Sequence, residues 1–155
     1  MKKWIFILSS LLAAQFILTA TVNLTDEDYE AFQAEEKVLS FDEKEVDSLR
    51  IEDGTDSVLL KKQEGKWLLP ESGNFPANQS SVKQLLGNLA IMKKGWPVAK
   101  TRSALRRFQV DEEQFERKLV LLSGDEAQAT LYVGTSPGFR KVYIRPADGD
   151  EVLAV

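Results

Sequence analysis

The chain has 155 residues, with 20 lysines and arginines, 24 acidic residues and a net charge of −4 at pH 7. Cysteine and histidine are both absent, which excludes thiolate nucleophiles, disulfides, the usual zinc ligands and any relay that passes through histidine. The length suits one domain, and the acidic balance argues against a general nucleic-acid binder.

An uncharged apolar run extends from Trp4 to about Leu24, directly after Lys2 and Lys3. About 20 such residues suffice to cross a bilayer, and basic residues before the span with acids after it orient the N-terminus to the cytoplasm. A cleaved secretory signal is the alternative, although the sequence around Ala20 is a poor cleavage site. Residues 1–24 are therefore predicted to be a transmembrane anchor or an uncleaved signal, followed by an exported chain.

Residues 25–40 are rich in acids and contain no glycine or proline. They are interpreted as an acidic juxtamembrane stalk, because a run of like charges is usually solvated. The exported domain is then expected to cover residues 41–155.

Alternating apolar residues predict three strands at the start of this domain, with a turn at residues 53–56 and a second at Glu64-Gly65. A loop follows, and Asn78 is placed to cap a helix over residues 79–94. The helix carries one apolar stripe, formed by Val82, Leu85, Leu86, Leu89 and Ala90. Lys93, Lys94 and Gly95 suit the end of that helix.

Trp96-Pro97 is expected to begin a connection, and "TRSALRRF" (residues 101–108) a short second helix or turn that packs Leu105 and Phe108 on the sheet. From Lys118 onward the strand period returns in four segments, ending with "EVLAV" at residues 151–155. Strands followed by helices and more strands predict an α+β fold: a mainly antiparallel sheet with one main amphipathic helix packed on it, preceded by the transmembrane helix. The final apolar strand needs a neighbour in the sheet.

The stretch "LYVGTSPGFRKVYIR" (residues 131–145) superficially resembles a phosphate-binding loop. Such a loop needs glycine, four residues and then Gly-Lys-Ser/Thr leading into a helix. Here only three residues separate Gly134 from Gly138, and β-forming residues follow. The stretch is interpreted as two strands joined by a hairpin loop, with Leu131 and Val133 on one face and Tyr132 on the other.

The segment "KKGWPVAKTRSALRRF" (residues 93–108) combines aromatic and basic residues. In one interpretation Trp96 and Phe108 belong to the core, and the arginines offset the acidic strands. In the other, Trp96, Arg102, Arg106 and Arg107 contact a partner or an anionic ligand, because Trp and Arg are enriched at interface anchors.

Catalysis is not expected. The acidic residues are numerous enough for chance pairs, and none lies in an apolar motif that would raise its pKa. Ser80, Ser81 and Lys83 are explained by the first turn of the helix. We therefore expect no catalytic residue, no cofactor and no metal.

The segments "VDSLRI", "GKWLL", "FPAN", "VKQLLGNL", "LYVG" and "VYIR" are similar to a bacterial family, the domain of unknown function 4340, over roughly Leu39–Val155. Family members place a Phe-Gly-Leu-like element where this chain has Phe108-Gln109-Val110, so Gln109 departs from the pattern. The resemblance implies a single-pass protein of the bacterial inner membrane with a periplasmic or otherwise extracytoplasmic domain, often encoded beside gliding-motility-type ABC-transporter components. It implies no catalytic residue.

Two functions follow from these observations. The first is a non-catalytic accessory or scaffold subunit that binds other membrane or envelope proteins, such as ABC-transporter subunits. The second is a ligand-binding module for an envelope polysaccharide or lipid. The identity of the partner, the oligomeric state and whether a longer protein continues beyond Val155 are left open by the residues alone.

Overall fold

The computed structural model describes residues 12, 15, 36–138 and 140–155. The chain divides into two compact units, Met1–Gln33 and Ala34–Val155. The predicted anchor at residues 1–24 lies outside the described residues except for Leu12 and Gln15. No helix in the described part of the chain is long and apolar enough to span a membrane.

The second unit contains strands, two α-helices and a 3-10 turn. Their bounds are β1 (Ser48–Glu52), β2 (Ser57–Gln63), β3 (Lys66–Leu69), η1 (Pro70–Ser72), β4 (Phe75–Pro76), α2 (Gln79–Ile91), β5 (Pro97–Ala99), α3 (Arg102–Arg107), β6 (Arg117–Ser123), β7 (Glu126–Val133), β8 (Tyr143–Pro146) and β9 (Val152–Ala154). The expected α+β architecture of the domain is confirmed.

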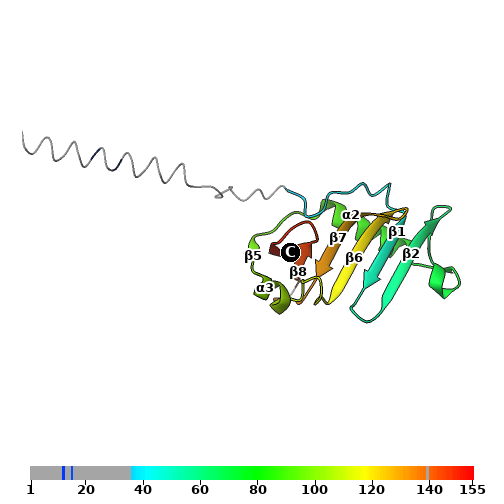
Figure 1. Ribbon diagram of the computed structural model, residues 1–155. Helices are drawn as coiled ribbons and strands as arrows, with labels where there is room; N and C mark the ends of the chain where they lie inside the picture. The colour runs from blue at the N-terminus through cyan, green and yellow to red at the C-terminus, as the bar shows by residue number, and fades with distance from the viewer. Residues whose placement is uncertain (1–11, 13–14, 16–35, 139) are drawn as a thin grey trace, which may run out of the picture. The chain divides into compact units, whose positions relative to one another are not determined.

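All strands join one sheet in the order β4-β3-β2-β1-β6-β7-β8-β9-β5, and every pairing in it is antiparallel. The strands before α2 form one half as a meander, and the strands after α3 form the other half as a second meander (Figure 1). The two halves meet where β1 pairs with β6, Leu49 lying opposite Leu121.

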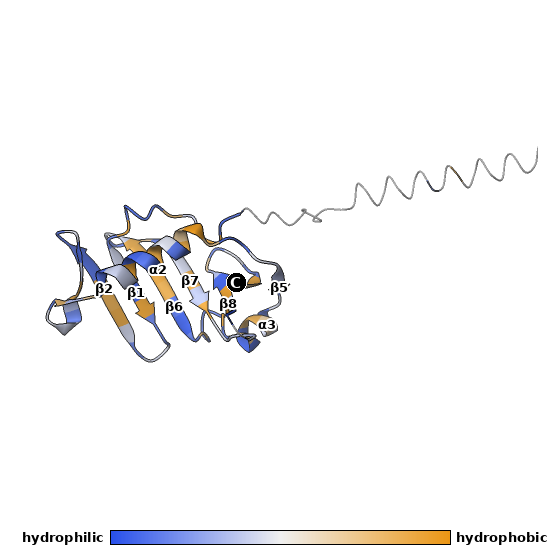
Figure 2. Cartoon of the chain, turned by 180° about the vertical axis from the view of Figure 1, so that it is seen from behind, coloured by the Kyte–Doolittle hydropathy of each residue, from blue (hydrophilic) through white to orange (hydrophobic). Residues whose placement is uncertain are grey.

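Helix α2 lies across one face of this sheet (Figure 2). The Asn78 side chain accepts a hydrogen bond from the Ser81 amide at 3.1 Å, which confirms the predicted cap. Val82, Leu86 and Leu89 from the predicted stripe are buried against Leu49, Trp67, Leu121, Leu131, Ile144 and Leu153 of the strands. This cluster is the main core.

The main core also takes in residues from the predicted stalk. Val38 and Leu39 are 4% and 5% exposed, and the Val38 amide donates to the Met92 carbonyl at 2.9 Å. The compact unit begins at Ala34, so the domain starts before residue 41, where the sequence placed it. The sequence prediction assigned these two apolar residues to the stalk because the surrounding segment is acidic. The part of the stalk at residues 25–35 lies outside the described chain.

A smaller core occupies the opposite face of the sheet. It contains Ala104 and Phe108 from α3 and its cap, together with Val110, Tyr132 and Val152. Leu131 and Val133 pack in the main core, so Tyr132 between them points to the other face, as the alternation predicts. The expected packing of Phe108 and Leu105 on the sheet is confirmed.

The end of α2 differs from the prediction. The helix ends at Ile91, and its cap residue Met92 is extended, so Lys93 and Lys94 lie beyond the helix. Lys93 bridges to Lys37 in an antiparallel backbone pair, and the Lys94 amide donates to the Glu36 carbonyl. Pairing with this incoming segment therefore replaces the last predicted helical turn.

Gly95 also has a different role from the one predicted. A Cβ atom there would lie 2.6 Å from the Ala154 carbonyl oxygen, so glycine is needed for close approach to β9 and not to end a helix. The predicted connection at Trp96-Pro97 contains β5, which pairs with β9. This pairing supplies the neighbour that the apolar final strand requires.

Both edges of the sheet are short strands that contain proline. They are β4, with Pro76, and β5, with Pro97. Proline removes a backbone donor, and short edges of this kind disfavour the addition of a foreign strand. A partner of this domain is therefore expected to contact side chains more than backbone edges.

Candidate functional site

The predicted contact residues lie on two successive segments at the β5 edge. Trp96 directly precedes β5, and Arg102, Arg106 and Arg107 are on α3, which lies next to β5 at the same end of the sheet (Figure 1). Thr101 caps α3 by accepting from the Ala104 amide at 3.3 Å. Ala104 is buried in the smaller core, so the three arginines occupy the exposed side of the helix.

Trp96 is 71% exposed, which corrects the interpretation that it belongs to the core. Two further apolar residues that sequence reasoning missed are exposed nearby in the chain: Ile91 (71%) at the end of α2 and Val98 (44%) in β5. The alternation of β5 directs Ala99 toward the smaller core. No pattern marked Ile91 as exposed, because the helix was expected to continue past it.

Ion pairs neutralise only part of this basic segment. Arg106 lies 3.5 Å from Glu113, Lys94 lies 2.7 Å from Glu36, and Lys100 contacts Glu151. The Arg107 guanidinium lies 4.6 Å above the Phe108 ring. Within the described part of the chain, no ion pair joins Lys93, Arg102 or Arg107 to a carboxylate. One interpretation held that the arginines offset the charge of the acidic first strands. The ion pairs do not support it, because none joins these arginines to those strands in the described part of the chain.

A second surface feature lies on the sheet face opposite α2. It is an open depression of about 490 Å³, which we call the sheet depression. Its lining residues are Arg50, Glu52, Gly54, Thr55, Asp56, Ser57, Leu59, Glu71 and Phe115. Leu49 packs beneath α2, so its neighbour Arg50 points to the other face. Phe115 comes from the loop after α3, and Glu71 from η1.

The charged side chains in and beside the sheet depression differ in whether they have an ion-pair partner. Glu52 is engaged by Lys118 at 3.2 Å, whereas Arg50 has no carboxylate within ion-pair distance in the described part of the chain. The amides of Asp56 and Thr55 donate to Asp53 at the rim and hold the pKa of its carboxyl below the usual value. Sequence reasoning missed this site because its residues come from three separate segments.

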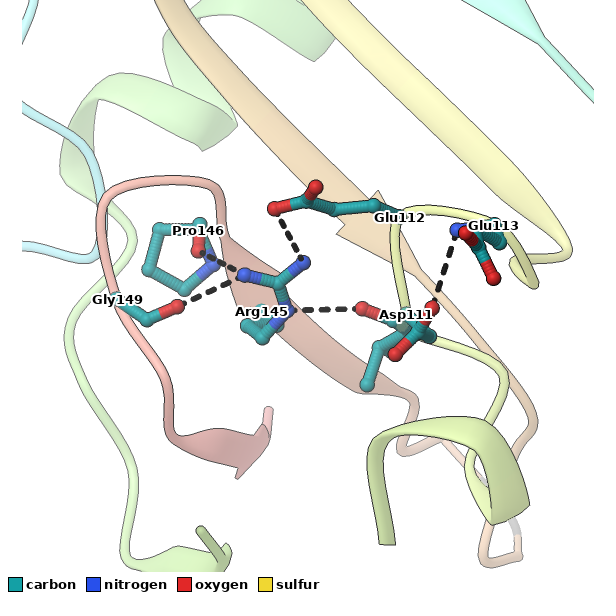
Figure 3. Close-up of polar contacts among 7 residues, drawn as sticks. Asp111, Glu112, Glu113, Arg145, Pro146 and Gly149 are labelled. Atoms are coloured by element: carbon teal, nitrogen blue, oxygen red, sulfur yellow. Dashed lines mark hydrogen bonds and ion pairs between the residues drawn. The ribbon is translucent and has the colours of Figure 1, made fainter. Parts of the chain in front are cut away.

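The buried side chain of Arg145 is the centre of a cluster of polar contacts (Figure 3). Its Nε donates to the Val110 carbonyl at 2.8 Å, and its Nη1 donates to the carbonyls of Gly149 (2.9 Å) and Pro146 (3.4 Å). The guanidinium lies 4.6 Å from the Tyr132 ring centroid, and Glu112 is 4.0 Å away. These bonds hold the loop after α3 and the turn between β8 and β9 against the sheet, so Arg145 has a structural role.

The suspected phosphate loop is explained by packing. A Cβ atom at Gly134 would lie 2.0 Å from the Phe108 carbonyl oxygen, and the next amide, of Thr135, donates to that oxygen at 3.0 Å. Glycine at position 134 therefore permits a backbone contact between the β7–β8 loop and α3. The hairpin interpretation is confirmed by the antiparallel pairing of β7 and β8.

A family model described as domain of unknown function (DUF4340) matches residues 67–155. The chain belongs to this family. Neither the comparison with curated proteins nor the comparison with solved structures gave a match. The DUF4340 match begins at Trp67 in β3, later than the resemblance at Leu39 suggested, and it includes α2, β5, α3 and the second meander. Strands β1 and β2 precede the match and complete the same sheet.

The resemblance placed a glycine where this chain has Gln109. Gln109 has a φ of 56°, in the left-handed region that glycine adopts most readily. A glutamine therefore occupies a backbone conformation in the turn after α3 that suits glycine.

Proposed function

We propose that this protein is a non-catalytic, membrane-anchored subunit of a bacterial envelope complex, and that the sheet depression binds a protein partner. The proposal assigns the anchor to residues 1–24 and the exported part to the α+β domain. An association with an ABC transporter is part of the proposal and rests on the family resemblance.

The observation that supports a partner-binding role is the composition of the sheet depression. It places an exposed arginine, Arg50, beside an aromatic side chain, Phe115, on a face that α2 does not cover. Arg and aromatic residues dominate the energetics of protein interfaces. Leu59, opposite Arg50 on β2, adds apolar surface. The acidic side chains of Asp56 and Glu71 give such a partner a preference for basic residues opposite them.

Co-purification from detergent-solubilised membranes tests this proposal. The wild-type chain is expected to recover a membrane protein, and Arg50→Glu to lose it, because the substitution replaces the basic side chain that lines the depression by an acidic one. Lys66→Glu is the matched control, since Lys66 is exposed beyond β2 and does not line the depression. The proposal would be contradicted if, after mild cross-linking, the wild type and Arg50→Glu were both recovered without any partner protein.

A further inference from the structure

Three apolar side chains are exposed along the segment from the end of α2 to β5. Ile91, Trp96 and Val98 have exposed fractions of 71%, 71% and 44%. Tryptophan is the residue most typical of the boundary between a bilayer and water, where one end of its ring is apolar and the other polar. We call residues 91–107 the basic edge, for the charges described next.

The charge of the basic edge is opposite to that of the whole chain. Residues 91–107 contain six basic residues and no acidic residue, in a chain whose net charge is −4. Lys93, Arg102 and Arg107 are not neutralised by carboxylates in the described part of the chain. Exposed apolar residues flanked by cations are the combination by which a protein surface binds anionic lipid headgroups.

The basic edge also lies where the N-terminal segment joins the domain. The Glu36 carbonyl accepts from the Lys94 amide at 2.8 Å, the Val38 amide donates to the Met92 carbonyl, and Lys37 bridges to Lys93. If the span ends at Leu24, eleven residues separate it from Glu36, and a tether of eleven residues reaches at most about 40 Å. A tether of this length keeps the basic edge at a high effective concentration near the lipid surface.

We infer that the basic edge docks on an anionic phospholipid surface, with Ile91, Trp96 and Val98 in the headgroup region and Lys93, Arg102 and Arg107 against lipid phosphates. This inference rests on the anchor in the proposed function and adds an orientation to it. The strand residues of the sheet depression belong to β1 and β2, which lie five and six positions from β5 in the sheet. At about 4.8 Å per strand, these residues lie roughly 25–30 Å from the β5 edge, so docking leaves this part of the depression accessible to a partner.

The absence of cysteine makes a direct test possible. Val98→Cys in the full-length chain, labelled with the environment-sensitive fluorophore NBD, is reconstituted into vesicles of phosphatidylcholine alone or with 30% phosphatidylglycerol. The expected result is a blue shift and a several-fold increase in emission in the anionic vesicles. Phe75→Cys is the matched control, because Phe75 is also an exposed apolar residue (65%) but lies at the opposite edge of the sheet. Its label is expected to give the same signal in both lipids.

A charge variant tests the electrostatic part of the inference. Replacing Lys93, Arg102 and Arg107 by Gln in the Val98→Cys chain is expected to lower the docking equilibrium by about a hundredfold, since each cation near an anionic surface contributes roughly fivefold. The label at position 98 should then report the signal seen in neutral vesicles. Unchanged circular dichroism shows that the variant still folds.

The inference is overturned if the label at position 98 is equally exposed to water in both lipids while the chain floats with the vesicles. Flotation with neutral vesicles tests the anchor separately. A chain that floats only with anionic vesicles, with the label shifted, would support lipid docking and contradict the anchor.

Discussion

Gly134 shows at the scale of one residue how a loop can resemble a ligand-binding motif for a packing reason. Its missing side chain lets the β7–β8 loop touch the Phe108 carbonyl. Local sequence marks such a glycine as special, but it does not identify the contact, because Phe108 is distant along the chain. The sequence therefore excluded the phosphate loop correctly and left the role of Gly134 unexplained.

Gly134→Ala is expected to destabilise the domain by about 3 kcal/mol, because the new Cβ would overlap backbone atoms that cannot move independently. Gly87→Ala is the matched control. Gly87 lies inside α2 with nothing within 4 Å of an added Cβ, so alanine should stabilise the helix by about 0.5–1 kcal/mol. Urea unfolding of both variants measures the two changes. Equal stability of Gly134→Ala and the wild type would contradict the close contact.

The Asp47 carboxyl is expected to make the stability of the domain depend on pH. The Gly124 amide and the Ser48 hydroxyl donate to its carboxylate at 2.9 and 2.8 Å. These bonds lower the pKa of the Asp47 carboxyl below its usual value, and Lys61 lowers it further. A lowered folded-state pKa contributes stability above the unfolded value, about 3.9, and this stability is lost as the pH falls through the folded value.

Asp47→Asn should therefore reduce the free energy of unfolding at pH 7 by about 1 kcal/mol, which is below the usual range for bonds to a charged group because the site is close to solvent. The difference from the wild type should shrink below pH 4, as the wild-type carboxyl becomes protonated. Urea titrations at pH 7 and at pH 3 provide the comparison. A difference that grows as the pH falls would refute this assignment.

At the scale of elements, the regular parts of the chain were predictable and their ends were not. The stripe from Val82 to Leu89 predicts α2 because helical periodicity is local. The end of α2 depends on residues 36–38, which pair with residues 92–94 from 54 or more positions away. Likewise, β5 forms only because β9 lies beside it. Local patterns contain no information on such pairings.

Arg145 connects elements that no local signal joins. It bonds the loop after α3 to the turn between β8 and β9. Arg145→Met is expected to lower the free energy of unfolding by about 3 kcal/mol, since it leaves the Val110 and Gly149 carbonyls without their donor. Arg117→Met, at an exposed position of β6, should change it by less than about 0.5 kcal/mol. Thermal unfolding of the two variants tests the difference, and equal effects would rule out a structural role for Arg145.

At the scale of the whole molecule, the two surface features lie on different parts of the sheet. The basic edge was predictable in part, because its contact residues are close together in the sequence: Trp96, Arg102, Arg106 and Arg107. The sheet depression was not visible, because Arg50, Glu71 and Phe115 meet only after β1, η1 and the loop following α3 are assembled. A lipid-facing edge and a separate partner-binding depression would suit a subunit that holds another membrane protein near the bilayer.

Residue-specific photo-cross-linking in native membranes tests the central claim most directly. A benzophenone amino acid at position 59, inside the sheet depression, is expected to form an adduct with one membrane protein that mass spectrometry identifies. The same probe at position 75, exposed at the β4 edge outside the depression, is expected to give no such adduct. The account would be contradicted if position 59 yielded no protein adduct, or if both positions captured the same proteins equally.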